Sequence, residues 1–143
     1  MKNFFVKDFL VSFDVAAIDN VLENFVQGKI ISLRAVDDFT NFPPVENYSW
    51  NWYLLESFLR KHSEKFIFHN AEINNSNIGA IYPKSMHFAD YLDVQVAVVL
   101  QEKIPLEPEE VGNFLIEKGF RGQRSTKVIQ RIIQQAKEIL NLR

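Results

Sequence analysis

Cysteine is absent from this chain of 143 residues. Without thiols the protein has no disulfide scaffold, no cysteine-ligated zinc or iron–sulfur site and no thiol nucleophile. Long apolar runs are also missing, since the longest uninterrupted one, residues 96–100, is far short of the roughly 20 residues that a membrane span needs. Lys7 and Asp8 interrupt the start of the chain, where a secretory signal would be continuously apolar. We therefore expect a cytoplasmic protein that does not contact a membrane.

Glycine and proline are few, with five of each, and the fractions of hydrophobic and charged residues, 47% and 24%, are those of an ordinary soluble protein. This composition argues against collagen-like chains and low-complexity disorder. At about 150 residues per domain the length corresponds to one domain, which can bury about two thirds of its unfolded surface. Eleven of the thirteen phenylalanines precede residue 90, so we expect the N-terminal two thirds to build the main core.

Apolar residues recur at spacings of three and four in several segments, which is the pattern of a helix with one buried face. Asp14, Ser49 and Ser125 stand where N-cap residues are preferred, and Ser85 can serve in the same way. Residues 85–102 fit a strand as well as a helix, and their length favours a helix because strands rarely exceed about ten residues. The predicted helices span residues 14–27, 49–63, 85–102, 108–119 and 125–140.

Three short segments rich in β-branched or aromatic residues predict strands, at residues 29–34, 65–69 and 78–82. The second and third strands would form a hairpin around a segment rich in asparagine, which favours turns. We therefore predict an α+β fold, in which helices cover a small antiparallel or mixed sheet and a helix-turn-helix-like unit follows at the C-terminus.

Pro43-Pro44 marks the clearest break in the chain, because proline neither continues a helix nor pairs in the centre of a sheet. We predict one domain over residues 1–143. A subdivision would give an N-terminal element over 1–42, a central α/β part over 49–104 and a cationic helical unit over 105–143.

Positive charge gathers near the end of the chain, although the whole chain has a formal net charge of −2. Residues 119–143 contain six basic side chains and one acidic side chain. Such a cluster indicates an anionic partner, and a cationic second helix after a short link is the arrangement of helix-turn-helix readers of DNA. We therefore predict a small regulatory or accessory protein that binds DNA or RNA, with phosphate contacts from Arg121, Arg124, Lys127 and Arg131.

The same segment also allows a protein-interaction or self-assembling module without a nucleic-acid role, in which the cations only solvate the helix. An apolar stripe on the last predicted helix suits either a helix pair between subunits or packing within the core, and it consists of Ile129, Ile132, Ala136 and Ile139. Trp50 and Tyr53 are candidate partner contacts, because the aromatic residues around them cannot all face one core and such rings are favoured at interfaces. The partner would then be a second copy or another protein.

Three histidines, His62, His69 and His87, are candidates for a general base or a metal ligand. Their spacing matches no strong metal motif such as His-Glu-x-x-His. The acidic residues that could assist them are scattered along the chain: Glu56, Glu72 and Asp90. A hydrolytic enzyme is thus an alternative that no motif supports, and we predict no metal site and no cofactor.

Overall fold

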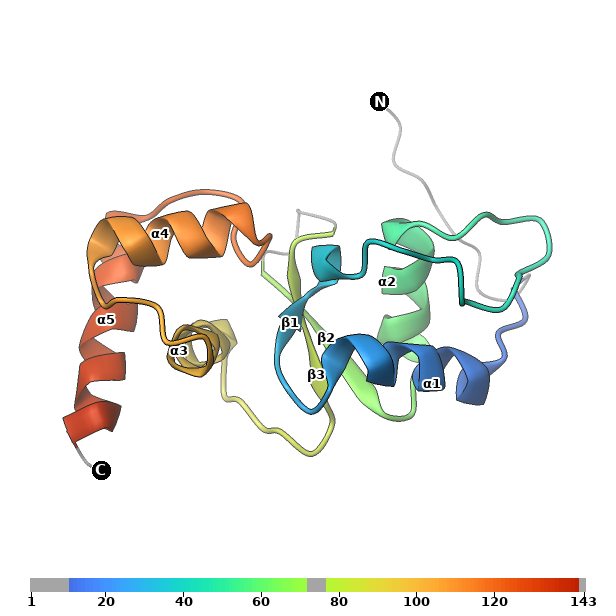
Figure 1. The fold of residues 1–143 in the computed structure, drawn as a ribbon, viewed down its shortest axis with the longest axis horizontal. Helices are drawn as coiled ribbons and strands as arrows, with labels where there is room; N and C mark the ends of the chain where they lie inside the picture. The colour runs from blue at the N-terminus through green and yellow to red at the C-terminus, as the bar shows by residue number, and fades with distance from the viewer. Residues whose placement is uncertain (1–10, 72–76, 142–143) are drawn as a thin grey trace.

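A three-stranded antiparallel sheet lies between two groups of helices (Figure 1). The computed structural model describes residues 11–71 and 77–141, so Glu72 lies outside the described residues. The helices are α1 (Val15–Val26), α2 (Trp52–Lys61), α3 (Tyr91–Gln101), α4 (Pro108–Glu117) and α5 (Thr126–Asn141), with a 3-10 helix η2 (Leu33–Ala35), and the strands are β1 (Ile31–Ser32), β2 (Phe66–Asn70) and β3 (Gly79–Pro83). The predicted α+β fold with a C-terminal helical unit is confirmed.

The strands are ordered β1-β3-β2, which makes β3 the strand with a neighbour on each side. The predicted hairpin of β2 and β3 is confirmed, with Phe68 opposite Ile81. β1 joins the other side of β3, where Ser32 lies opposite Ala80. Both predicted strands of the hairpin lie within one residue of their observed bounds.

Side chains of β3 alternate between the two groups of helices, as the two-residue period of a strand requires. Ile81 packs into an apolar cluster with α1 and α2, whereas Ala80 and Tyr82 pack into a second cluster with α3, α4 and α5. None of these three residues is more than 3% exposed. Each face of the sheet therefore packs against its own apolar cluster.

The core is divided between the two halves of the chain, unlike the expectation that the N-terminal two thirds build most of it. Aromatic side chains such as Phe58 and Phe66 are prominent in the cluster on α1 and α2. Valines and isoleucines of α3, α4 and α5 make up most of the other cluster. The count of phenylalanines overlooks that cluster because a buried valine or isoleucine also contributes about 1.5–3 kcal/mol.

Three of the helices begin directly after a residue whose side chain accepts a backbone N–H of the first helical turn. Asp14 caps α1 through a bond of 3.2 Å, as predicted. Asn51 rather than Ser49 caps α2, and Asp90 rather than Ser85 caps α3, with bonds of 2.9 and 3.0 Å to the N–H three residues on. The two predicted starts are wrong because Asn and Asp cap as well as Ser does, and they stand closer to the first helical turn.

β1 is much shorter than the predicted strand over residues 29–34, since only two residues pair with β3. Leu33 begins η2, which leads the chain away from the sheet. The side chain of Gln101 pairs with the backbone of Ile30, donating to its C=O and accepting from its N–H, each at 2.9 Å. This amide group ties the strand β1 to α3.

A buried carboxylate joins α1 to the turn between α2 and β2. Asp19 is 1% exposed and accepts the Ser63 hydroxyl at 2.7 Å. It also accepts the backbone N–H groups of Glu64 and Lys65, at 2.9 and 3.2 Å. The Ser63 hydroxyl in turn accepts the N–H of Phe66 at 3.0 Å. These donors replace the water that the carboxylate loses on burial.

Replacing Asp19 by alanine should lower the free energy of unfolding by about 2–4 kcal/mol, because three donors then lose their acceptor. Replacing Asp14 by alanine is the control, since an exposed N-cap of this kind contributes only about 1 kcal/mol. Urea denaturation followed by circular dichroism measures both variants. Equal losses in the two variants would contradict the role given to Asp19.

Candidate interaction surface

Helix α5 carries two of the predicted cations and is held by its apolar stripe. Ile129, Ile132 and Ala136 pack against the rest of the C-terminal cluster and are at most 4% exposed. These three residues belong to the core and are closed to a second molecule. Ile139 and Leu140, at the end of the helix, are 38% and 45% exposed and are the exposed large hydrophobic residues of the described chain.

Two grooves run along α5, one beside α3 and one beside the start of α4. The groove beside α3 has a volume of about 620 Å³ and the groove beside α4 about 420 Å³. Their apolar lining consists of Phe88, Val96, Ala97, Leu100, Ile139 and Leu140 in the first and of Leu106, Pro108 and Ile133 in the second. No pattern in the sequence predicts either groove, because each is formed by segments that are far apart along the chain. The one feature of the sequence that points to this surface is that the apolar stripe of α5 continues to Ile139, beyond the buried part of the helix.

Arg121 and Arg124, two of the four predicted phosphate contacts, make bonds within the helical unit. Arg121 is half-buried, and its Nη1 donates to Gln95 Oε1 on α3 at 3.2 Å. Arg124 donates to Asn113 Oδ1 on α4, and its guanidinium lies so close over Gly112 that a Cβ there would collide with it. Both arginines thereby fasten the link before α5 to the two preceding helices.

Lys127 and Arg131, the other two predicted phosphate contacts, are exposed and lie about one turn apart on the outer side of α5. Neither side chain makes a hydrogen bond or an ion pair with the residues that the structure describes. Lys137 is exposed on the same helix and lines the groove beside α4. The structure thus brings two of the predicted residues together on an open face and places the other two in internal bonds.

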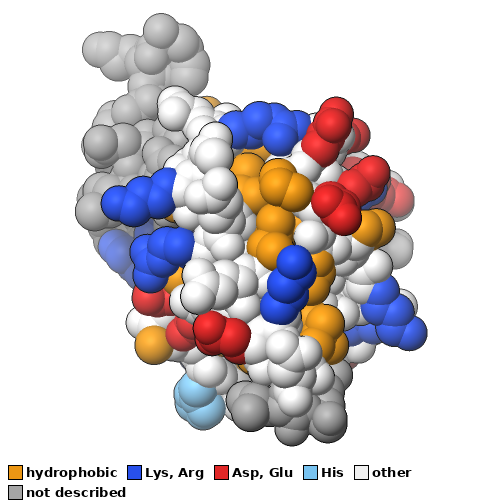
Figure 2. All heavy atoms as spheres, turned by 90° about the vertical axis from the view of Figure 1, so that its left-hand side faces the viewer, with side chains coloured by type: hydrophobic (Ala, Val, Ile, Leu, Met, Phe, Trp, Pro, Cys, Tyr) orange, Lys and Arg blue, Asp and Glu red, His pale blue; other side chains and the backbone are white. Residues whose placement is uncertain are grey.

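Charges on this side of the molecule are spread around an apolar centre. Figure 2 shows hydrophobic side chains in a stripe down the middle of the face, with one basic side chain lying on the stripe, further Lys and Arg at its top and on both sides, and acidic side chains at the upper right and lower left. The start of α4, which lies on this side of the molecule in Figure 1, contributes exposed acidic residues: Glu107, Glu109 and Glu110. The face therefore combines an exposed apolar stripe with charges of both signs.

A polar cluster joins the sheet to the helical unit. His69 Nδ1 lies 3.0 Å from the Tyr82 hydroxyl, and its ring meets Tyr91 edge-on with 5.2 Å between centroids. The Tyr91 hydroxyl donates to the Phe120 carbonyl at 2.5 Å. Burial lowers the pKa of His69, against a smaller opposing effect of the Asp90 charge, and burial raises the pKa of both tyrosines. Because both tyrosine hydroxyls are hydrogen-bonded, this cluster connects β2, β3, α3 and the link between α4 and α5.

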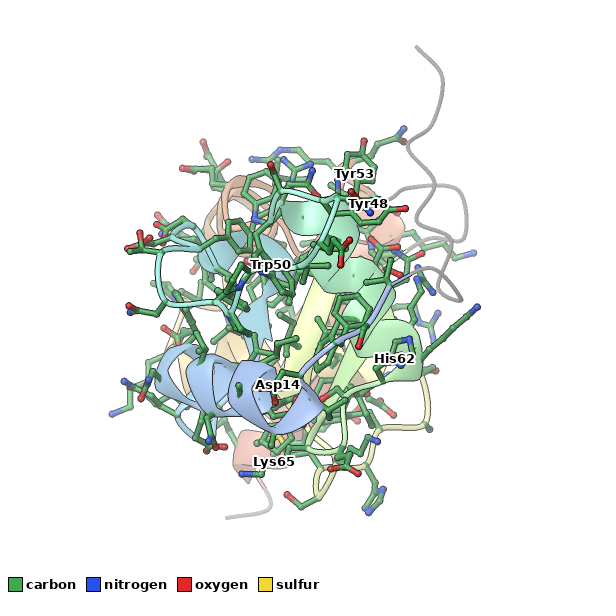
Figure 3. The ribbon with its side chains drawn as sticks, turned by 90° about the vertical axis from the view of Figure 1, so that its right-hand side faces the viewer. Asp14, Tyr48, Trp50, Tyr53, His62 and Lys65 are labelled. Carbon is green, nitrogen blue, oxygen red and sulfur yellow. The ribbon has the colours of Figure 1, made fainter. Side chains whose placement is uncertain are left out.

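Trp50 and Tyr53, the predicted partner contacts, are both half-buried. Trp50 Nε1 donates to the Pro43 carbonyl at 2.6 Å, and its ring stacks on Phe39 at an interplanar angle of 11°. Figure 3 shows Tyr48 beside Tyr53 near the start of α2, with Trp50 closer to the middle of this side of the molecule. Trp50 therefore packs against the N-terminal core, and Tyr48 and Tyr53 are half-buried beside it.

The three histidines do not form a common centre. The ring of His62 packs against Phe13 at 5.1 Å between centroids, and His87 is exposed on the segment before α3. Within residues 11–71 and 77–141, no group of three or more His, Cys, Asp or Glu side chains could hold a metal ion. The described part of the chain therefore offers no assembled metal site.

Comparison with protein-family models, with curated proteins and with solved structures finds no match to this chain. Among the described helices, none is both long enough and apolar enough to cross a membrane.

The free energy of unfolding should fall as the pH is lowered through the range in which His69 titrates. Burial favours the neutral imidazole, so the folded pKa lies below the ordinary value of 6.5. Between the two values the unfolded chain binds more protons, so this contribution is complete above pH 6.5 and is lost as the pH falls toward the folded pKa. Urea denaturation at a series of pH values measures the slope, which His69→Gln should flatten. An unchanged slope in the variant would contradict this assignment.

Proposed function

We propose that the protein is a homotypic interaction module, in which two copies associate through the face that α5 presents beside its two grooves. One observation carries the proposal: the exposed large hydrophobic residues of the described chain lie at a groove on a face that carries charges of both signs. A module of this kind acts by bringing two copies of the chain into one assembly.

Apolar contact is the first contribution to this association. Ile139 and Leu140 project beside the groove that Phe88 and Leu100 line. A projecting pair of side chains next to a groove suits a two-fold interface, in which the ridge of each copy enters the groove of the other. Each Å² of apolar surface removed from water in this way contributes about 25 cal/mol before the costs of association.

Charge favours a second copy over other occupants of this face. When two copies meet around a two-fold axis along the stripe of Figure 2, the right side of one face meets the left side of the other. The acidic side chains at the upper right of one copy then face the basic side chains at the left of its partner, twice by symmetry. The start of α4 carries the exposed Glu109 and Glu110, and α5 carries the exposed Lys127 and Arg131, so we infer that these two pairs of residues form the contact.

Two charge-reversed variants test the pairing, one with Glu109→Lys and Glu110→Lys and the other with Lys127→Glu and Arg131→Glu. Light scattering at tens of micromolar should give a dimer for the wild-type chain and a monomer for each variant, because like charges then meet at both contacts. An equimolar mixture of the variants should form a heterodimer, because both contacts are again between opposite charges.

Leu140→Glu tests the apolar part of the face and should also give a monomer. Asn24→Glu, on an exposed position of α1, adds the same charge elsewhere and should leave the dimer intact. A wild-type chain that scatters as a monomer would rule out the proposal, as would a mixture of the charge variants no heavier than either alone.

We propose nucleic-acid binding through α5 as a second candidate function, and the open cations of this helix support it. Lys127, Arg131 and Lys137 are exposed and form no ion pair within the described residues. Their charges are therefore available to the phosphates of DNA or RNA, with release of counterions on binding. Arg121 and Arg124 are secondary in this proposal, since both already donate within the protein.

Gel shifts with duplex DNA test this second candidate. Wild-type binding should weaken steeply between about 50 and 200 mM salt, and Lys127→Ala with Arg131→Ala should weaken it further at every salt concentration. Lys29→Ala with Lys103→Ala removes the same charge at exposed positions elsewhere and is the matched control. The absence of a shift at low salt, or an equal effect of the control, would exclude this role for α5.

A further inference from the structure

The two edges of the sheet differ in how their backbone groups are paired. At the edge formed by β1, Gln101 bonds both the N–H and the C=O of Ile30. The opposite edge is β2, and no described strand lies on its outer side. An open edge of this kind offers donors and acceptors to a further strand.

The register identifies the groups of β2 that face outward. Lys65 C=O and Ala71 N–H bond to the β3 side of the hairpin, and bonded positions alternate along an antiparallel ladder. Phe66 and Phe68 therefore direct their backbone groups away from β3. The position of Pro83 opposite Phe66 agrees with this assignment, because proline has no N–H to donate. The C=O of Phe66 and both backbone groups of Phe68 have no partner among the described residues.

A groove of about 290 Å³ follows this edge, between β2 and the end of α2. Its charged lining is basic and consists of Arg60, Lys61 and Lys84. Lys65, which pairs with Lys84 across the hairpin, is exposed at the start of β2. Glu64 is the one acidic residue between α2 and β2. The open edge therefore carries an excess of positive charge.

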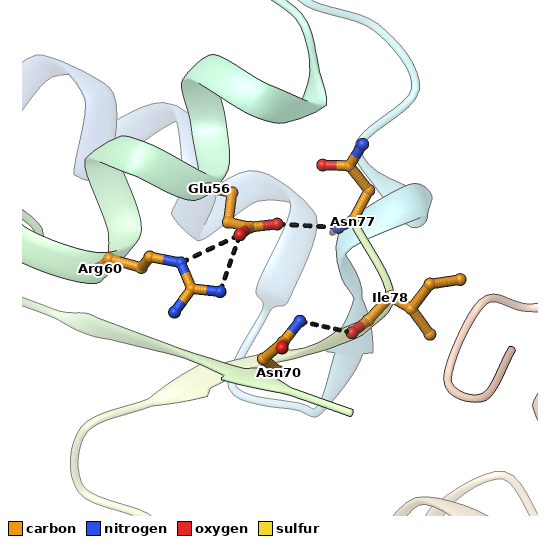
Figure 4. A network of polar contacts seen from close by, with 5 residues as sticks. All are labelled: Glu56, Arg60, Asn70, Asn77 and Ile78. Atoms are coloured by element: carbon orange, nitrogen blue, oxygen red, sulfur yellow. Dashed lines mark hydrogen bonds and ion pairs between the residues drawn. The ribbon is translucent and has the colours of Figure 1, made fainter. Parts of the chain in front are cut away.

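Arg60 is held along this edge by a network on α2 (Figure 4). Its Nη2 and Nε donate to Glu56 Oε2 at 2.7 and 2.9 Å, and its guanidinium lies 5.4 Å from the centre of the Phe68 ring. Glu56 Oε1 accepts the N–H of Asn77 at 2.8 Å, which fixes the segment that leads into β3. Arg60 thus shapes the wall of the groove. Lys84 Nζ donates to the Ser63 carbonyl at 2.8 Å, which holds its charge beside the start of β2, and neither Lys65 nor Lys84 pairs with a described carboxylate.

We propose that the β2 edge binds an extended acidic segment of a partner protein by strand addition. The backbone of that segment pairs with the open groups of Phe66 and Phe68, and its carboxylates at alternate positions reach Lys65 and Lys84. A second copy of β2 does not suit this edge, because two basic edges would repel each other. The edge belongs to the central sheet and is separate from the α5 face (Figure 1).

The probe for this proposal is a fluorescent peptide of alternating valine and glutamate. The wild-type chain should bind it saturably in anisotropy titrations, and hydrogen exchange at the Phe68 amide should slow in the complex. Lys65→Glu with Lys84→Glu should weaken binding about tenfold, since two attractive pairs become repulsive. Lys29→Glu with Lys103→Glu is the matched control and should bind the peptide like the wild-type chain.

A second measurement needs no change in the protein. The same peptide N-methylated at alternate amides keeps its charge but cannot form the ladder, and it should lose binding. Equal affinity for the methylated peptide or for a valine–lysine peptide would overturn the proposal, as would the lack of saturable binding. Single-stranded DNA is the last competitor. If it displaces the acidic peptide, and the peptide does not slow hydrogen exchange at the Phe68 amide, the edge binds nucleic acid and the proposal is overturned.

Discussion

The burial of β3 on both faces is the constraint on which the rest of the structure depends. Ala80, Ile81 and Tyr82 are consecutive residues, yet Ile81 belongs to one apolar cluster and its two neighbours belong to the other. A shift of one residue in the pairing would exchange the two faces and place the Tyr82 ring among the helices that now receive Ile81. Gly79 permits this register, because a Cβ at that position would collide with the backbone of His69.

Polar side chains fix the positions of helices on this sheet, because apolar packing by itself does not specify how a helix is oriented. Asp19 on α1 binds the turn before β2, and Gln101 on α3 binds the backbone beside β1. Both contacts join segments that are distant in sequence, and each side chain makes more than one hydrogen bond. A buried polar group costs stability unless its partner is present, so these bonds favour one arrangement of the helices over others.

The surface that remains after this packing decides what the protein can bind. Four cations near the end of the chain predict one patch, but Gln95 and Asn113 engage Arg121 and Arg124 from other helices. A local charge count could not reveal those partners, because the bonds depend on how α3 and α4 pack. The grooves beside α5 and the basic edge of β2 are hidden from sequence reasoning for the same reason, since each combines residues from separate elements.

The sequence by itself determined the elements: the helical period of α1 and α5, the caps at Asp14 and Ser125 and the hairpin of β2 and β3 all follow from interactions within a few residues. Only the tertiary structure decided which strand is central, where β1 ends, which arginines stay open and where apolar surface is exposed. These features depend on contacts between distant segments, and in this chain such contacts are set by the packing of two helix groups against the opposite faces of one strand.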